Sequence, residues 1–186
     1  MWSDEVGKIM AGYWETFDTI VMGRRTYEAA IRLGKGDGSY PGMKSYVFSR
    51  TLKPKSNQTL EITSEDPAKV VARLKQQTGK DICIMGGGLL AKPLLEAGLI
   101  DEIGFNIHPV LLGSGIPIFH EMKHQIDLKL IECKVLKNGC VMVTYRVKPA
   151  GENKKLTAKS AKRVKSGKKA TKVKKPKIST GAVGTG

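Results

Sequence analysis

Three short apolar runs, each ending at a glycine or a serine, constrain the fold of this chain more than any other feature. The runs cover residues 19–22, 46–48 and 82–85, and helical patterns cover 25–33, the segment between Asp66 and Gly79, and 89–97. Each apolar run has the length of a buried strand and is too short for a typical helix. Strands that alternate with helices need crossover connections, which give a mostly parallel sheet covered on both faces. The predicted fold class is therefore α/β.

Further elements flank this central part. Apolar residues recur every three or four positions between Trp2 and Phe17, which predicts an amphipathic helix whose aromatic side chains belong to the core. Further strands are predicted at residues 103–110, 128–136 and 140–147. The last two are separated by an Asn-Gly dipeptide at 138–139, which favours the tight turn of a β-hairpin. The domain is thus predicted to close with an antiparallel hairpin at its edge.

The charged residues divide the chain into two unequal parts. The whole chain has 186 residues and a formal net charge of +15. Residues 148–186 hold 13 basic residues and one acid, so they carry +12 and leave +3 on residues 1–147. This basic segment has no aromatic residue and no apolar periodicity, so it cannot bury enough surface to offset the entropy of ordering it. We expect one folded domain over 1–147 and a disordered Lys-rich tail over 148–186.

The composition also excludes several classes of protein. No apolar run approaches the roughly 20 residues that a membrane helix needs. The first residues lack the basic and apolar regions of a secretory signal, so we expect a cytoplasmic protein without membrane contact. Cys83, Cys133 and Cys140 occur without a Cys-x-x-Cys pair, a pattern that favours reduced structural thiols over a disulfide framework or a metal site.

The first candidate site follows the first predicted strand, where Gly23, Arg24, Arg25 and Thr26 open a helix. Ligands in open α/β sheets bind at the carboxyl ends of the strands. Free backbone N–H groups, a hydroxyl and two guanidinium groups can face an anion together here, which is typical of a phosphate site. Taken alone, the same residues also fit an ordinary helix start with two solvated arginines.

The second candidate site follows the second predicted strand. Ser49, Arg50 and Thr51 offer a planar cation and two hydroxyl groups. This set suits a phosphate monoester such as the one on the ribose of NADPH. Without other evidence it is only a polar loop.

The third candidate site is a run of glycines after the third strand. Gly86, Gly87 and Gly88 let the backbone approach a diphosphate closely, because no Cβ intervenes, and a helix that includes Leu89 and Leu90 begins directly behind them. The spacing imitates the dinucleotide fingerprint. That fingerprint requires an acid at the end of the following strand, whereas Asp101 and Glu102 precede it here, which argues against a standard Rossmann site.

Two histidine-containing segments lack the context that their chemistry requires. Residues 120–124 fit the His-Glu-x-x-His signature of zinc proteases, which needs one continuous helix. Pro117 and the strand pattern after Asp127 leave no room for that helix, so no metal is expected. His108 lies in an apolar strand, where a histidine is more often structural than catalytic.

Taken together, these segments resemble the dihydrofolate reductase-like superfamily, in particular the reductase domain of the bacterial riboflavin deaminase-reductase and its stand-alone relatives. The segments that carry the resemblance are residues 19–28, 47–50, 84–88, 97–103, 109–115 and 117–119. The block from Ala97 to Phe119 is the most specific, because it contains Leu-Ile-Asp-Glu-Ile, Pro-Val-Leu-Leu-Gly-Ser-Gly and Pro-Ile-Phe in order. The resemblance covers about residues 3–147 and does not include the tail.

The resemblance implies a fold, a cofactor and an activity. The fold would be a three-layer αβα domain with a mostly parallel central sheet and a C-terminal antiparallel hairpin, often assembled as a homodimer. NADPH would bind across the carboxyl edge of the sheet, with Gly23–Thr26 and Gly86–Leu90 at the phosphates and Ser49–Thr51 at the 2′-phosphate. The substrate would be a small heterocyclic or phosphorylated molecule, most specifically 5-amino-6-(5-phosphoribosylamino)uracil. No residue matches the family's substrate-side acid, so no catalytic side chain is assigned.

One family element has no counterpart in this sequence. The family begins with a central strand that carries a Ser-x-Asp-Gly-like segment, ahead of the helix with which this sequence starts. Its absence would leave backbone groups of the neighbouring strands unpaired. Three explanations stay open: a start further upstream, a strand from another chain, or loss of activity.

A second hypothesis concerns the tail. Lys168-Lys169 and Lys174-Lys175-Pro176-Lys177, with Ala, Ser and Thr between them, resemble linker-histone tails in composition. Such runs bind nucleic-acid phosphates without reading sequence and with a steep dependence on salt. Under this hypothesis, the chain is a nucleic-acid-associated protein that binds through its tail and carries a vestigial reductase fold. The plainer alternative is a solubilising extension.

Overall fold

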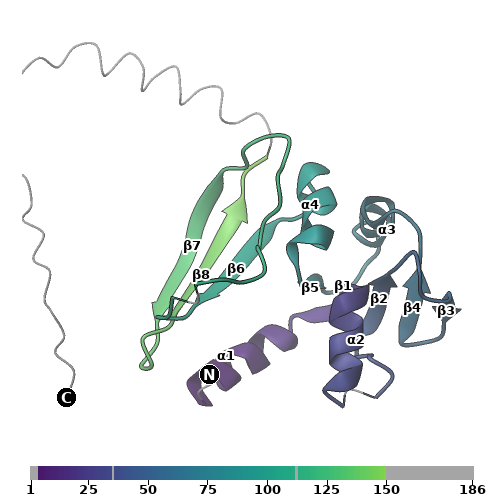
Figure 1. Ribbon diagram of the computed structural model, residues 1–186, viewed down its shortest axis with the longest axis horizontal. Helices are drawn as coiled ribbons and strands as arrows, with labels where there is room; N and C mark the ends of the chain where they lie inside the picture. Colours follow the sequence, from purple (N-terminus) through teal and green to yellow (C-terminus); the bar gives the residue numbers. More distant parts are fainter. Residues whose placement is uncertain (1–3, 35, 112, 150–186) are drawn as a thin grey trace, which may run out of the picture. The chain divides into compact units, whose positions relative to one another are not determined.

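The computed structural model describes residues 4–34, 36–111 and 113–149 (Figure 1). Its helices are α1 (Asp4–Trp14), α2 (Arg24–Arg32), α3 (Pro67–Leu74) and α4 (Gly88–Glu96). Its strands are β1 (Phe17–Gly23), β2 (Lys44–Phe48), β3 (Lys55–Ser56), β4 (Leu60–Thr63), β5 (Asp81–Met85), β6 (Glu102–Ile107), β7 (Leu128–Val135) and β8 (Val141–Val147). The predicted tail, residues 148–186, lies outside the described residues from Ala150 onward.

The first five strands form a mostly parallel sheet in the order β3-β4-β2-β1-β5 (Figure 1). β1 pairs in parallel with β2 and with β5, and β2 pairs in parallel with β4, whereas the two-residue strand β3 is antiparallel to β4. The predicted α/β class is confirmed. β3 and β4 were not predicted, because only Leu60 and Ile62 interrupt a polar segment there.

Helices cover both faces of this sheet because the second half of β1, an interior strand, is apolar on both sides. Ile20, Val21 and Met22 of β1 have no exposed surface. Ile20 and Met22 belong to the core cluster that contains Tyr27 of α2, whereas Val21 belongs to the cluster formed with α3 and α4. A strand buried on both faces reads as a continuous apolar run instead of an alternation. The three layers follow from that run.

The helices begin and end where local chemistry dictates. The Asp66 side chain accepts a hydrogen bond from the backbone N–H of Ala68 at 2.8 Å and caps α3, with Pro67 at its first position. α3 ends at Leu74, short of the predicted stop at Gly79, because Leu74 is its last buried apolar residue. Gly98 has a φ of +66° and closes α4, as predicted.

β6, β8 and β7 form a second, antiparallel sheet in that order. The predicted hairpin is present: Leu136 donates its backbone N–H to the Cys140 carbonyl at 2.8 Å, and Gly139 in the turn has a φ of +81°. The hairpin was expected at the edge of the domain, and the structure shows that it pairs with β6 in a sheet separate from the parallel one. β6 alternates Ile103, Gly104, Phe105, which is the pattern of an antiparallel strand with one apolar face.

Four strands are paired on one side only within the described residues, namely β3 and β5 in the first sheet and β6 and β7 in the second. β5 pairs with β1 and β6 pairs with β8, and no described strand joins the two sheets. Within the same residues, no helix combines the length and the apolar character that crossing a membrane requires.

Candidate functional site

The register of the parallel strands brings the three predicted junctions to one edge of the sheet. Gly23 at the end of β1 is paired with Phe48 of β2, and Met22 is paired with Met85 of β5. The segments that begin at Gly23, Ser49 and Gly86 therefore leave the sheet side by side at its carboxyl edge. This edge is where ligands bind in open α/β sheets.

No described side chain caps the N-terminus of α2. Gly23 is the N-cap residue, it supplies no side-chain hydrogen bond, and the first turn contains no acid. The first backbone N–H groups of a helix have no partner within the helix, and they carry a partial positive charge. Arg24 and Arg25 are both exposed in this turn, and Arg24 pairs with Glu28 at 3.2 Å. The turn can thus receive an anion.

The N-terminus of α4 is open in the same way. Gly87 is the N-cap residue without a side-chain hydrogen bond, and the first turn again contains no acid. Gly86 has a φ of +110°, a conformation that side chains other than glycine rarely adopt. A Cβ on Gly86 would overlap the Thr26 hydroxyl, and one on Gly88 would overlap the Ile118 carbonyl oxygen. The backbone is therefore held close to its neighbours on both sides of the turn.

The N-terminus of α3 differs from those of α2 and α4, because a side chain caps it. The helix begins after β4, which is parallel to β2, so its N-terminus faces the same edge. The Asp66 carboxylate fills that N-terminus. Of the three helices that start at this edge, the two that begin in glycine thus keep their N–H groups available. The donor set at α2 and α4 fits a diphosphate.

The segment after β2 is shaped by Ser49. Its side chain is buried, and its Oγ accepts the backbone N–H groups of Thr51 at 3.2 Å and of Leu52 at 3.0 Å. Ser49 thus holds the turn, a role that the sequence did not reveal. Arg50 at the corner is exposed, so its guanidinium is the group of this segment that is best placed to meet an anion.

Not every predicted site residue offers its side chain. Leu90 is 8% exposed and belongs to the core between the sheet and α3, and its backbone N–H donates to the Gly87 carbonyl at 3.2 Å. Leu89 is 67% exposed. The structure therefore places the two leucines at the helix start, with Leu90 serving to anchor α4.

Comparison with known proteins agrees with this architecture. A family model described as the RibD C-terminal domain matches residues 1–142. The chain belongs to the RibD C-terminal domain family. The predicted resemblance is confirmed by this match.

Two relatives come from Bacillus subtilis (strain 168), and both are described as uncharacterized. YyaP is 39% identical over 102 residues, which make up 55% of this chain and 54% of YyaP, so the match spans about half of that relative. YwjB is 35% identical over 133 residues, which make up 69% of this chain and 76% of YwjB.

Two crystal structures share the fold. A protein from Shewanella sp. PV-4, provisionally described as a riboflavin biosynthesis protein, is 24% identical with a TM-score of 0.63, over 75% of this chain and 78% of that one. A pyrimidine reductase-like protein from Corynebacterium diphtheriae is 18% identical with a TM-score of 0.53, over 71% of this chain and 76% of that one. At these identities the likeness shows that the fold is shared.

The structure adds residues that the sequence did not indicate. The Ile118 carbonyl and the His120 ring lie against Gly88, so the segment before β7 borders the glycine turn. Tyr40 donates its hydroxyl to the Met85 sulfur at 3.1 Å and stacks on Trp14 with ring centroids 5.7 Å apart. Burial raises the pKa of Tyr40, so the phenol stays protonated at neutral pH. Tyr40 and Ile118 lie in loops, where no periodicity marks a residue as important.

The two histidine segments behave as parts of loops. Residues 120–124 form no helix, so the two imidazoles of the protease-like signature are not on consecutive helical turns. In the described part of the chain, no three His, Cys, Asp or Glu side chains cluster as metal ligands would. His108 lies with its Nδ1 3.1 Å from the thiol of Cys140, which is 2% exposed. Cys83, Cys133 and Cys140 are all free thiols.

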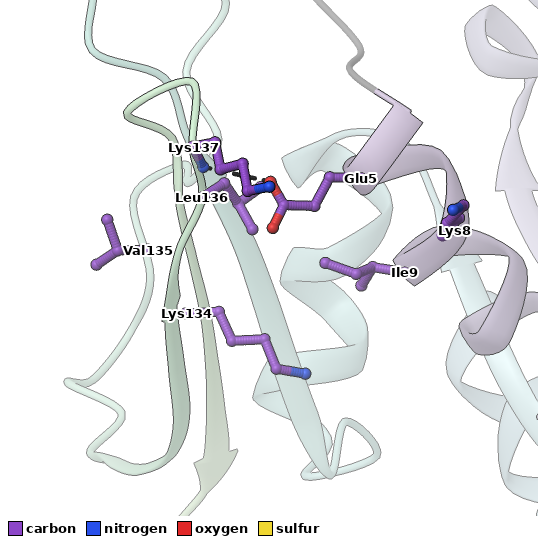
Figure 2. A pocket seen from close by; sticks show the side chains of 7 residues that line it. All are labelled: Glu5, Lys8, Ile9, Lys134, Val135, Leu136 and Lys137. Carbon is purple, nitrogen blue, oxygen red and sulfur yellow. Dashed lines mark hydrogen bonds between the residues drawn. The ribbon is translucent and has the colours of Figure 1, made fainter.

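A separate cavity of about 540 Å³ lies between α1 and the β7–β8 hairpin (Figure 2). Its lining consists of Glu5, Lys8, Ile9, Lys134, Val135, Leu136 and Lys137. Glu5 accepts the backbone N–H of Lys137 at 3.3 Å, and Lys134 pairs with Glu132 at 2.9 Å. Two of its charged groups are thus already occupied, and none of the predicted site residues lines this cavity.

Proposed function

We propose that this chain is an NADPH-dependent reductase of a small heterocyclic or phosphorylated substrate, most specifically 5-amino-6-(5-phosphoribosylamino)uracil. Membership of the RibD C-terminal domain family supports this assignment. The names of two proteins that share its fold, one from riboflavin biosynthesis and one pyrimidine reductase-like, point the same way.

One observation carries the cofactor part of the proposal. Two helices at the carboxyl edge of the parallel sheet begin in glycine without a side-chain cap, whereas the neighbouring α3 is capped by Asp66. Glycine starts that leave N–H groups unpaired are what a diphosphate needs, because the oxygens replace the missing caps. Thr26 joins the two starts through its contact with Gly86.

The residues of this edge have separate tasks when NADPH binds. The first turns of α2 and α4 would hold the two phosphates, and Arg50 would meet the 2′-phosphate that distinguishes NADPH from NADH. NADPH supplies the hydride that reduces the substrate, and the protein orients it. Trp14, Tyr40 and Met85 contact one another near the end of β5 and offer partly buried apolar surface there.

A cofactor titration of the whole chain tests the proposal. Quenching of tryptophan fluorescence and energy transfer to the nicotinamide report binding, and NADH serves as the comparison. We expect micromolar binding that prefers NADPH, followed by loss of nicotinamide absorbance when the pyrimidine substrate is added. A folded sample that binds neither nucleotide contradicts the assignment.

A second function rests on the charge of the C-terminal segment. The 13 basic residues among residues 148–186 support nonspecific binding to nucleic acid. This function is independent of the reductase site and can coexist with it.

A further inference from the structure

The cavity between α1 and the β7–β8 hairpin has the size of a ligand pocket. Its walls come from residues 5–9 of α1 and from residues 134–137, at the end of β7 and in the turn of the hairpin (Figure 2). Its volume of about 540 Å³ lies within the range of about 300–1,000 Å³ that pockets for small ligands have. Of the described residues assigned to NADPH above, none lines it. The chemistry of this cavity therefore follows from its own side chains.

One wall of the cavity is apolar. Leu136 is 4% exposed and forms a small core cluster with Cys140, against which Ile9 and Met142 pack. Figure 2 shows the Ile9 side chain directed from α1 toward the hairpin. A hydrocarbon group that lies against Ile9 and Leu136 removes apolar surface of both the ligand and the protein from water, which is favourable. This wall favours a ligand with an apolar body.

The rest of the lining carries more positive than negative charge. It contains the ammonium groups of Lys8, Lys134 and Lys137 and the carboxylate of Glu5, three cations against one anion. The three lysines are exposed, whereas Glu5 is half-buried. The carboxylate of Glu132 lies 2.9 Å from the Lys134 ammonium and offsets a second cation. The surroundings of the cavity thus keep a positive formal charge.

The partners of these groups show which of them can meet a ligand. The Glu5 carboxylate accepts the backbone N–H of Lys137 at 3.3 Å, so it is held at the hairpin turn. In the described part of the chain, no carboxylate oxygen lies within 4.0 Å of the Lys137 ammonium. Lys134 reaches toward α1 in Figure 2, and its ammonium has three donors, of which Glu132 needs only one. Lys134 and Lys137 can therefore both donate to an anion.

We propose that this cavity binds a small organic anion that joins a carboxylate or a phosphate group to an apolar body. The charged group would lie between Lys134 and Lys137, and the apolar body would lie against Ile9 and Leu136. Hydrogen bonds from an ammonium group to an anion are stronger than those between neutral groups. The ligand needs both parts, because exposed ion pairs alone contribute little in water and an apolar wall alone does not select an anion.

A matched set of ligands tests the two parts separately. Octanoate has the charge and the apolar body, octanamide has the body without the charge, and acetate has the charge without the body. Octyl phosphate, compared with inorganic phosphate, distinguishes a phosphate group from a carboxylate. Isothermal titration calorimetry of the full chain gives each dissociation constant. We expect octanoate or octyl phosphate to bind about tenfold or more tightly than octanamide, and acetate and inorganic phosphate to show no saturable binding.

Two substitutions in the hairpin locate the binding. Lys134→Gln and Lys137→Gln each remove one charge from an exposed side chain, so the fold is kept, and circular dichroism checks this. Each should weaken binding of the octyl anion by about three- to tenfold and leave octanamide binding unchanged. Lys129→Gln removes an exposed charge from the same strand outside the lining and should bind like the wild type.

Four results would overturn the proposal. If octanamide binds as tightly as octanoate and octyl phosphate, the cavity does not select an anion. If inorganic phosphate binds as tightly as octyl phosphate, surface charge alone is responsible. The cavity is also not the site if no octyl compound binds, or if the octyl anion binds unchanged to both Lys134→Gln and Lys137→Gln.

The titrations need no cofactor, so their result is independent of the proposed reductase activity. Repeating them with saturating NADPH separates the two sites. We expect the dissociation constant of the octyl anion to stay the same, because the lining of the cavity shares no residue with the proposed cofactor site. Displacement of the anion by NADPH would place it at the carboxyl edge of the parallel sheet and overturn the proposal. A chain that fails to bind NADPH but binds the octyl anion contradicts the reductase assignment alone.

Discussion

Thr26, in the first turn of α2, packs against Gly86 so closely that Gly86 has no room for a side chain. The two residues come from different junctions, one after β1 and one after β5. Their contact fixes the distance between the two open helix starts, and a diphosphate that bridges those starts depends on that distance. The contact therefore links the packing of the fold to the proposed site.

Gly86→Ala tests this link. The substitution places a side chain at a φ of +110° and against the Thr26 hydroxyl, so we expect a loss of about 1–3 kcal/mol in the free energy of unfolding and at least tenfold weaker NADPH binding. Thermal unfolding and a cofactor titration measure the two effects. Gly87→Ala is the matched control for strain, because its φ of −84° is ordinary and nothing lies within 4 Å. Equal melting temperatures for the two variants would contradict the strain argument.

Arg50→Ala should shift the cofactor preference toward NADH. Arg50 is exposed at the corner after β2, so its loss should weaken NADPH binding by about tenfold and leave NADH binding and stability unchanged. Arg24→Ala, in the turn assigned to the diphosphate, should instead weaken the binding of NADPH and NADH alike. Arg32→Ala, at the far end of α2, is the control for a lost surface charge. An unchanged ratio of the two dissociation constants would remove the 2′-phosphate assignment.

Ser49→Ala should act on stability first. Its Oγ accepts two backbone N–H groups, from Thr51 and Leu52, and alanine would leave these donors without a partner. We expect a loss of about 1–3 kcal/mol in the free energy of unfolding. Chemical denaturation measures it. Stability equal to the wild type would show that the hydroxyl does not hold the turn.

Asp18 should make the stability depend on acid pH. Its carboxylate accepts the backbone N–H of Lys80 at 2.6 Å and the Thr19 hydroxyl at 2.8 Å, and chiefly the hydrogen bond from Lys80 lowers the pKa of Asp18. A lowered pKa in the folded state contributes stability above the ordinary carboxyl range, and this contribution is lost as the pH falls through the folded value. Asp18→Asn should therefore cost about 1 kcal/mol at neutral pH and progressively less below about pH 4.

The control for this effect is Asp101→Asn. Asp101 also pairs with a lysine, Lys75, but its side chain is 77% exposed, and such surface pairs contribute little. Denaturation curves from neutral to acid pH compare the two variants. If both lose the same stability at every pH, the hydrogen bonds of Asp18 are not the cause.

Removal of the C-terminal segment should separate the two proposed functions. A chain ending at Pro149 loses most of the 13 basic residues, so we expect it to lose salt-sensitive binding to DNA and RNA while NADPH binding stays the same. Fluorescence anisotropy with labelled nucleic acid at several salt concentrations gives the slope. Impairment of both kinds of binding to the same extent would show that the segment and the domain are not independent.

The sequence predicted the parallel part of the fold because its signals are local. β1 contains a continuous apolar run at residues 20–22, and the glycines at 23 and 86–88 mark the strand ends. β4 escaped prediction because two apolar residues in a polar segment are too few to define a strand, and its pairing with β2 is decided by distant residues. β6 was predicted as a strand, whereas its pairing with β8 in a separate sheet was not, because that pairing is decided by distant residues.

The site was predictable only in part, for a similar reason. Glycine and arginine after a strand can be found by inspection, and the structure places them together. The contact of Ile118 and His120 with Gly88 joins residues about thirty positions apart, and no sequence pattern in the loop predicts this contact. The turn-forming role of Ser49 likewise depends on where its hydroxyl points.

The irregular register of β7 has a consequence for how relatives should be aligned. Leu130 is paired with Tyr145 and Glu132 with Thr144, so Ile131 is one residue more than β8 requires. Without this extra residue the strand would still alternate correctly, because Glu132 and Lys134 would stay on the face of the sheet that also carries Lys129. Ile131 thus acts as a spacer outside the repeating frame of the strand. A homologue one residue shorter in β7 should have its alignment gap at Ile131. A gap at another position of the strand would assign residues of the homologue to the wrong face of the sheet.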